Sequence, residues 1–294
     1  MAKYIVKPNQ NIFDVATMLH GSIEGIFDIL ISNDWMNMTT ELKAGMEIEY
    51  HDFYKTNDGI VSEIEEQGYL AANGERHVYY KRTEEPLVFV FAIAEEDTER
   101  MSFRVSANGG TMLVDWGDNS ELQEVLLTIE EKEIEHWFDN KVEKRRVRIY
   151  GNFELMTFDA ENIPGTIYAM CPVVVDEFRS HKNKYPLDGL LLFEGTYSVD
   201  LRGAKIKDLT PVGKMSLQTL DLRGADIGVS AVDDYLTYIV DNYGDRRDCT
   251  VLLTTEPSDA GMEAIQTIIG EESWNQSGQW VFDINGTIYT YSEQ

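Results

Sequence analysis

The chain has 294 residues, of which 43% are hydrophobic and 11% aromatic, enough for a large buried core or for two to three domains. Its 52 acidic and 25 basic residues give a formal net charge of −27, which argues against nucleic acid and anionic membrane surfaces as partners. The two cysteines, Cys171 and Cys249, have neither the spacing of a disulfide framework nor that of a zinc site, so neither is indicated. No apolar run approaches the roughly 20 residues of a spanning helix, so membrane insertion is not indicated.

Residues 1–50 have the pattern strand, helix, helix, strand. Tyr4-Ile5-Val6 is β-prone, and residues 42–50 supply a turn and a second strand. Between them, apolar residues recur at helical spacing in two groups: Ile12, Val15, Ala16 and Leu19 before Gly21, then Ile23, Ile26, Phe27 and Leu30 after Ser22. We therefore expect a small βααβ domain whose helices bury these two groups.

This segment resembles the LysM module in its opening Tyr-x-Val, its Ile12–Ala16 helix start, Asn33, and the closing Leu42-x-x-Gly45-Met46-x-Ile48. The resemblance implies a groove for N-acetylglucosamine-containing glycans between the two loops 9–12 and 33–40. Its candidate binding residues are Asn9, Gln10, Asn11, Ile12, Asn33 and Trp35. The Gly-Asp-Thr usual in the family is Asn9-Gln10-Asn11 here, so the alternative is a module that only docks the chain inside a larger assembly.

The stretch 51–86 loses this periodicity, and we interpret it as an extended connector that packs on its surroundings. Residues 87–150 then follow a β-like pattern, with strands expected at 87–93, 102–106 and 111–116.

The segment Val114-Asp115-Trp116-Gly117-Asp118 resembles the signature of small PKD-like β-sandwich modules. Asp115 and Asp118, together with the run Glu95-Glu96-Asp97, offer the oxygen ligands that Ca²⁺ takes. Turn-forming aspartates and a solvated charge run explain these residues equally well, so we assign no metal site.

Residues 151–294 contain an internal repeat. Val199-Asp200-Leu201-Arg202-Gly203-Ala204-Lys205-Ile206 returns about 21 residues later as Leu220-Asp221-Leu222-Arg223-Gly224-Ala225-Asp226-Ile227. Because one such unit cannot bury its apolar side alone, we expect the units to stack into a solenoid with parallel strands. The pattern resembles leucine-rich repeats of the BspA type, with Phe158 and Phe178 aligned with Leu201 and Leu222, and with Asn162 and Asn183 closing turns.

The C-terminal part predicts a cap for this solenoid. An amphipathic helix over 230–243 begins with Ser230 and Asp233 in a capping box and ends at Gly244. A strand at 251–253, a helix from Ser258 to Gly270, and a hairpin around Asn285-Gly286 follow.

Side-chain alternation along the repeated strands predicts one apolar and one polar face. The candidate partner-binding residues on the polar face are Glu177, Arg179, Asp200, Arg202, Asp221 and Arg223. We expect each arginine to meet a carboxylate of the next row diagonally. The functional interpretation is recognition of a protein or a sugar, and the alternative is that these charges only keep an exposed sheet soluble.

No catalytic motif stands out, since the five histidines are dispersed and Gly-x-Ser-x-Gly, Walker and Gly-x-Gly-x-x-Gly patterns are absent. We therefore expect a non-enzymatic protein without a cofactor. Its fold class is α+β multidomain: a LysM-like domain (1–50), the connector (51–86), a PKD/Ig-like β-sandwich (87–150), and a leucine-rich-repeat solenoid with a helix and hairpin cap (151–294).

This order of modules resembles proteins of bacteriophage tails and baseplates. The resemblance implies a virion protein, made in the host cytoplasm, that is part of a symmetric oligomeric assembly. Its partners would be other tail or baseplate proteins and a glycan or protein of the host surface. The start Met1–Pro8 shows no export signal, which favours this interpretation over the alternative, a bacterial cell-surface protein that binds peptidoglycan-type glycans.

Overall fold

A computed structural model describes residues 1–7, 9–72, 78–94, 98–138, 144–243, 248–276 and 278–291. The fold is mixed α+β and mostly β-sheet, as the sequence predicts at this level. The chain divides into two compact units: the first comprises Met1–Arg82, Asp115–Glu121 and Phe138–Arg145, and the second Thr83–Val114, Leu122–Trp137 and Arg146–Gln294.

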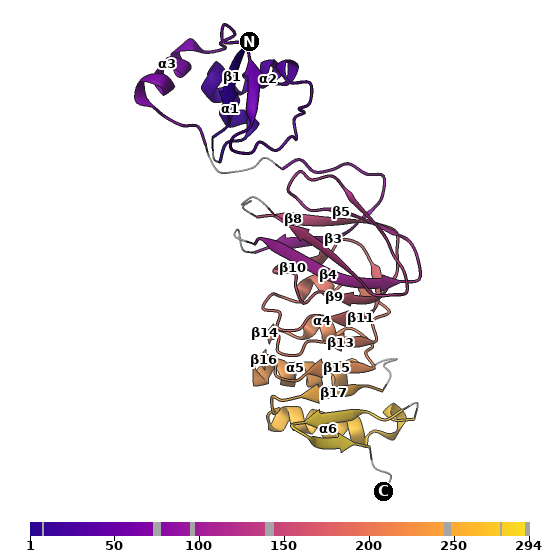
Figure 1. Ribbon diagram of the computed structural model, residues 1–294. Coiled ribbons are helices and arrows are strands. Elements are labelled where there is room, and N and C mark those ends of the chain that lie inside the picture. Colours follow the sequence, from indigo (N-terminus) through magenta and orange to yellow (C-terminus); the bar gives the residue numbers. More distant parts are fainter. Residues whose placement is uncertain are drawn as a thin grey trace. The chain divides into compact units, whose positions relative to one another are not determined.

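The N-terminal part of the first unit has the predicted βααβ order (Figure 1). Its elements are β1 (Ala2–Ile5), α1 (Ile12–His20), the 3₁₀ turn η1 (Ile23–Gly25), α2 (Ile26–Ser32) and β2 (Glu47–Tyr50), with β1 and β2 antiparallel. The core between helices and strands is made by Val6, Ile12, Val15, Ala16, Ile26, Ile29, Met36, Leu42 and Ile48. Ile23 and Phe27, which the helical spacing assigned to the buried stripe, are instead 58% and 63% exposed.

Helix α1 begins and ends at local signals. The Asn11 side chain accepts hydrogen bonds from the backbone N–H groups of Phe13 and Asp14, and Asp14 accepts from the Asn11 N–H, which completes a capping box. At the other end Gly21 adopts φ +73°, the left-handed conformation that closes many helices.

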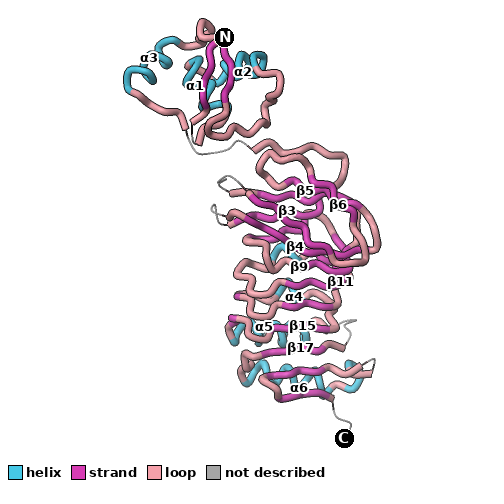
Figure 2. Tube along the Cα trace, in the orientation of Figure 1, coloured by secondary structure: helices cyan, strands magenta, loops and turns pink. Residues whose placement is uncertain are grey.

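A further helix, α3 (Asp58–Gln67), lies in the stretch 51–86, so the expectation of an extended connector is wrong for this segment (Figure 2). Its apolar residues at helical spacing are only Ile60, Val61 and Ile64, too few for the helix to be recognised, and of these only Val61 is buried. Its remaining signals are Asn57 as N-cap and Gly68 as left-handed C-cap. The N–H groups of Thr56 and Asn57 donate to the carbonyl of His20, which ties the start of α3 to the end of α1.

The second unit contains two large sheets. Its first strands are β3 (Leu87–Ile93), β4 (Arg100–Ala107), β5 (Thr111–Asp115, whose last residue belongs to the first unit), β6 (Gln123–Leu126), β7 (Lys132–Trp137) and β8 (Arg146–Gly151). They are followed by β9 (Leu155–Asp159), β10 (Gly165–Ala169), β11 (Val173–Arg179), β12 (Phe193–Glu194), β13 (Ser198–Asp200), β14 (Lys205–Ile206), β15 (Thr219–Leu222) and β16 (Asp226–Ile227). The last strands are β17 (Thr250–Leu253), β18 (Val281–Ile284) and β19 (Thr287–Thr290).

One sheet has the order β10-β3-β8-β5-β6, and the other β19-β18-β17-β15-β13-β11-β9-β4-β7. In the second sheet, β9, β11, β13, β15, β17 and β18 lie side by side in chain order, and each pairs in parallel with the next. Figure 1 shows this order from β9 to β17. The helical segments between them are η2 (Asp188–Leu190), α4 (Thr210–Gly213), α5 (Val229–Asp241), α6 (Asp259–Gly270) and η3 (Glu272–Trp274).

The repeated octapeptide segments stack as the sequence predicts. Val199 lies opposite Leu220, and the apolar residues Leu201 and Leu222 are buried on the inner side. The alignment of Phe178 with Leu201 is wrong by two residues, because Phe178 pairs with Val199. A shift of two residues leaves every side chain on its original face, so the apolar pattern alone does not distinguish the two registers.

The sheets do not stop at the expected domain boundary at residue 150. Strand β4 pairs antiparallel with β9, and β3 pairs antiparallel with β10, so each sheet contains strands from both sides of that position. A cluster of buried aromatic rings also spans both sides: Phe89, Phe91, Phe103, Phe158, Phe178 and Phe193. The parts of 87–150 that belong to the second unit therefore share one core with residues 151–294.

The C-terminal elements follow the predicted order with different details. Helix α5 begins after Gly228, so the capping box expected at Ser230 is wrong, and Asp233 instead accepts a hydrogen bond from the N–H of Ser258. The helix ends at Asp241, with Asn242 as C-cap, earlier than the predicted 230–243, and Gly244 itself lies outside the described residues. Strands β18 and β19 form the predicted hairpin, with Asn285 and Gly286 at φ +52° and +83° as a two-residue turn of this kind requires.

Candidate functional site

The glycan groove predicted within residues 1–50 is made largely of residues that form hydrogen bonds or apolar contacts inside the fold. Gln10 is 1% exposed: its Oε1 accepts from the Tyr4 hydroxyl and the Lys7 N–H, each at 2.8 Å, and its Nε2 donates to the carbonyl of Ala71. Asn11 caps α1, and Ile12 is part of the core. These side chains position the loop before α1.

The second loop of the predicted groove, residues 33–40, also contributes a side chain with an internal role. Asn33 is 4% exposed and joins α2 to β2, since its Nδ2 donates to the carbonyls of Ile29 and Glu49 while its Oδ1 accepts from the Glu49 N–H. Of the six candidates only Asn9 and Trp35 are exposed. The hollow between the two loops, which is also lined by Tyr79 and Asn119, measures about 20 Å³, room for about one water molecule.

The polar strand face contains a charged network. Arg202 donates from Nε and Nη2 to the Asp200 carboxylate at 2.7–3.0 Å, and Arg223 binds Asp221 in the same way. The main pairing therefore lies within one row, and the expected diagonal contact is the weaker one, with Arg202 Nε 3.6 Å from Asp221 Oδ2. Arg179 is bound elsewhere, to Glu131 at 2.5 Å.

The register explains this arrangement. Asp200 and Asp221 lie directly opposite each other on β13 and β15, where two like charges repel. Arg202 contacts both carboxylates and offsets this repulsion. Partial burial acts to raise the pKa of Asp200, but hydrogen bonds from Arg202 and His181 outweigh it and hold that pKa below its usual value.

The acidic and the basic side chains of this charged network differ in exposure. The carboxylate side chains of Asp200 and Asp221 are only 18% and 9% exposed, whereas the side chains of Arg202 and Arg223 are 48% and 51% exposed. The remaining candidate, Glu177, accepts a hydrogen bond from the Tyr197 hydroxyl at 3.2 Å. The face thus presents two guanidinium groups held in place by carboxylates beneath them.

The asparagines expected to close turns differ from each other. Asn162 is exposed, and its side chain forms no hydrogen bond with the described residues, so it does not close the expected turn. Asn183 does bond to backbone, accepting from the N–H of Tyr185, but within its own turn.

Asp115 and Asp118 serve as turn residues. Asp115 accepts from the N–H groups of Gly117 and Lys81, and Asp118 from the N–H and hydroxyl of Ser120. The run 95–97 lies outside the described residues, and within the described ranges no group of three or more His, Cys, Asp or Glu side chains is placed to hold a metal ion.

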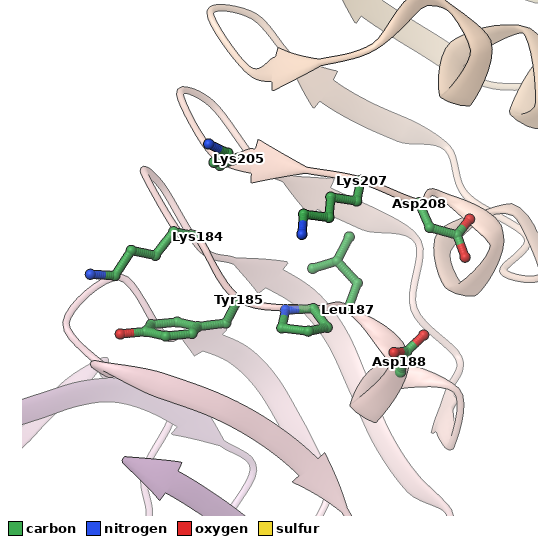
Figure 3. Close-up of a pocket in the computed structure, with 8 residues that line it drawn as sticks. Lys184, Tyr185, Leu187, Asp188, Lys205, Lys207 and Asp208 are labelled. Atoms are coloured by element: carbon green, nitrogen blue, oxygen red, sulfur yellow. The ribbon is translucent and has the colours of Figure 1, made fainter. Parts of the chain in front are cut away.

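A hollow of about 250 Å³ lies between the segments 184–188 and 205–208 of the second unit (Figure 3). Figure 3 shows Lys184 and Lys205 on one side, Asp188 and Asp208 on the other, and Leu187 and Lys207 between them. Asp208 is occupied by hydrogen bonds from the hydroxyl and N–H of Thr210, which lower its pKa. Lys205 lies 3.7 Å from Asp226. Because the charges of this hollow are of both signs and partly paired, it selects no single ligand chemistry.

The structure also brings together Ser32, His51 and Asp28 in the first unit, a combination that the sequence did not reveal. His51 Nδ1 lies 2.7 Å from the Asp28 carboxylate and 3.4 Å from the Ser32 hydroxyl. A catalytic relay needs the acid and the hydroxyl on opposite ring nitrogens, whereas here both face Nδ1. The cluster is therefore a structural link between α2 and the chain after β2.

Among the described residues no single helix is long and apolar enough to cross a membrane; only the pair 12–20 and 23–32, bent by 106°, meets the length and composition criteria when taken together. No protein-family model matches the chain, and comparison with curated proteins finds no match.

Proposed function

We propose that this chain is a non-enzymatic structural protein of a bacteriophage tail or baseplate. Its LysM-like module docks it to other proteins of the particle. Its second unit, which we interpret as a leucine-rich-repeat solenoid continuous with an Ig-like β-sandwich, presents a recognition face to a protein or a host-surface glycan. The observation that carries the proposal is the pair of exposed guanidinium groups, Arg202 and Arg223, held by largely buried carboxylates.

The charged pairs of this face contribute little to stability, because ion pairs with an exposed partner are worth only about 0–1 kcal/mol each. They do restrict the arginine side chains before any ligand arrives, which reduces the entropy lost on binding. The Nε and Nη2 donors of Arg202 and Arg223 are bound to Asp200 and Asp221, so a ligand carboxylate would meet the outer edge that the two Nη groups of each planar guanidinium form. Carboxylates of a partner protein or of an acidic sugar are the ligands that suit this face.

The role of the LysM-like module as a docking domain is supported by its internal hydrogen bonds. Gln10, Asn11 and Asn33 are committed to the fold of the module, and the hollow beside them is smaller than a sugar. A glycan would find few polar groups there. Docking through another part of the module is more consistent with this geometry.

The recognition face is tested by the double variant Arg202→Lys/Arg223→Lys, which retains both charges but removes the planar forks. We expect an unchanged melting temperature together with loss of host adsorption or of incorporation into particles. The matched control is Arg146→Ser, an exposed arginine on β8 in the other sheet. Normal adsorption and incorporation of the double variant would contradict a recognition role.

The class of protein is tested by the genes beside this one and by glycan binding. Tail-tube and baseplate genes on both sides support the proposal. Tight binding of the full chain to N-acetylglucosamine oligomers, with genes for cell-wall export alongside, supports the alternative of a cell-surface glycan-binding protein.

A further inference from the structure

The LysM-like module exposes a row of large apolar side chains on its second helical segment. Ile23, Phe27 and Ile31 follow one another at four-residue spacing along η1 and α2, and Trp35 follows shortly after the helix ends. Their exposed fractions are 58%, 63%, 76% and 54%. We refer to these four residues as the apolar face.

The packing of this helix does not require these residues. Ile26 and Ile29 already supply its contact with the core, at 3% and 0% exposure. Residues four apart lie on one side of an α-helix, so Phe27 and Ile31 form a ridge on a side of α2 away from Ile26 and Ile29, and Ile23 precedes them in the 3₁₀ turn η1. Single exposed apolar residues are ordinary on protein surfaces, but a contiguous row of large ones marks an interaction site.

The charges around the apolar face indicate the chemistry of the partner that would bind to it. The segment 23–35 contains Glu24, Asp28 and Asp34 and no basic residue. Asp28 is bound by His51, whereas Glu24 and Asp34 are exposed at the rim. A second copy of this chain would bring the same acidic rim and a further net charge of −27, and anionic lipids would be repelled in the same way.

We infer that the apolar face binds an amphipathic helix of a partner protein whose apolar residues recur every three to four positions and are flanked by Lys and Arg. A ridge of side chains at four-residue spacing fits the groove between the ridges of a second helix. Basic residues on the partner complement Glu24 and Asp34 and orient it. This inference rests on the proposed docking role of the module and names the surface and the partner chemistry through which docking occurs.

The test uses the full chain and a synthetic helical peptide of about 18 residues, with leucine at helical spacing and lysine elsewhere. We expect the peptide to bind and to shift the fluorescence of Trp35, a shift that Trp35→Phe removes. The double variant Phe27→Ser/Ile31→Ser should weaken binding by at least about tenfold, since two half-exposed apolar side chains no longer contribute. Its melting curve, compared with wild type, establishes that the module remains folded.

Two controls separate this surface from general attraction of a cationic peptide to an acidic protein. The variant Leu126→Ser/Ile129→Ser removes apolar side chains of similar exposure, 66% and 68%, from the second unit and should bind as wild type does. A peptide with glutamate in place of lysine should bind at least about tenfold more weakly. Equal binding by Phe27→Ser/Ile31→Ser and wild type, or equal binding of the two peptides, would overturn the inference. Concentration-dependent dimerisation through this face, or its protection by an N-acetylglucosamine hexamer, would also overturn it.

Particle incorporation distinguishes this inference from the proposed function. If deletion of residues 1–50 blocks incorporation and Phe27→Ser/Ile31→Ser does so too, the apolar face is the docking surface. If the deletion blocks incorporation but the double variant enters particles normally, the inference is wrong and the docking role stands. If neither change affects incorporation while the peptide still binds as described, the apolar face stands and the docking role within a particle is wrong.

Discussion

Replacement of Phe158 by alanine tests whether the second unit has one continuous core. Phe158 is 1% exposed and lies on β9, at the junction between the antiparallel and the parallel part of the large sheet. Its ring centroid lies 5.3 Å from that of Phe89 and 5.6 Å from that of Phe178, with Phe91 and Phe103 slightly further away. The side chain thus joins residues from both sides of position 150.

The expected loss of unfolding free energy is about 3–5 kcal/mol, the usual range for a buried Phe→Ala change. We place Phe158→Ala in the upper half, at about 4–5 kcal/mol, because the ring also has four aromatic neighbours whose pair contacts add about 0.5–1.5 kcal/mol each beyond buried area. With a urea dependence of about 2 kcal/mol per M, the unfolding midpoint falls by about 2 M.

The assay is urea unfolding followed by hydrogen exchange and mass spectrometry, which reports each strand separately. If the core is continuous, amide protection in β3 and in β17 is lost at the same, lowered urea concentration. Phe53→Ala serves as the control, because Phe53 is 81% exposed and its replacement should change stability by no more than about 0.5 kcal/mol.

Two results would refute this reasoning. A loss below about 1 kcal/mol would mean that the cluster is not a packed core. Protection in β17 that remains at the wild-type urea concentration, while β3 unfolds early, would mean that the stacked strands form a separate folding unit, as uncoupled repeats can.

Three further predictions follow from local structure. Asn11→Ala removes the cap of α1 and should lower the stability of the module by about 1 kcal/mol in thermal unfolding, and a change below about 0.3 kcal/mol would count against the capping box. Gly203→Ala places a side chain on a residue with φ +66° and should lower the free energy of unfolding by about 1–2 kcal/mol. Gly270→Ala, at the end of α6 with open space around it, should be neutral or slightly stabilising. Equal effects of the two changes in urea unfolding would contradict the strain argument. The pKa of Asp200 lies below its usual value in the folded state, so the unfolded chain binds the proton more readily. The contribution of this carboxylate to the free energy of unfolding is therefore full above its ordinary pKa of 3.8. This contribution is lost as the pH falls through the lower pKa of the folded state. Wild-type melting temperature should therefore fall more steeply than that of Asp200→Asn between about pH 5 and pH 2.5, and parallel curves would contradict this.

The acidic, motif-poor sequence predicts much of the local structure because the signals involved are short-range. Asn285-Gly286 specifies its hairpin, and Ser258 caps α6. The repeated octapeptide segments predict parallel strands with Leu201 and Leu222 inside, since one face of each unit must be covered by the next. Helix α3 was not predicted because it contains few apolar residues, and of these only Val61 is buried.

The candidate sites were less predictable, because a polar residue serves an internal role or an external one according to its surroundings. Gln10 and Asn33 have the side chains of sugar-binding residues, but the folded chain places backbone donors and acceptors around them. Phe27 has the spacing of a core residue, yet Ile26 and Ile29 occupy the inner side of its short helix and leave it exposed. Whether a residue is buried depends on the residues packed around it, and residues distant in sequence cannot be recognised from the local sequence pattern.

By itself, then, the sequence determined which segments become helices and strands over most of the chain, and which residues of the octapeptide repeat point inward, because period and turn chemistry act over a few residues. Only the tertiary structure decided that Phe178 pairs with Val199, since both registers keep the same face buried. It also decided that β4 pairs with β9, a strand about 50 residues later on the other side of position 150. Hydrogen bonds between the strand edges and the shared phenylalanine core select this pairing. Long-range strand pairing depends on which edges remain open after local structure has formed, and that is set by the whole fold.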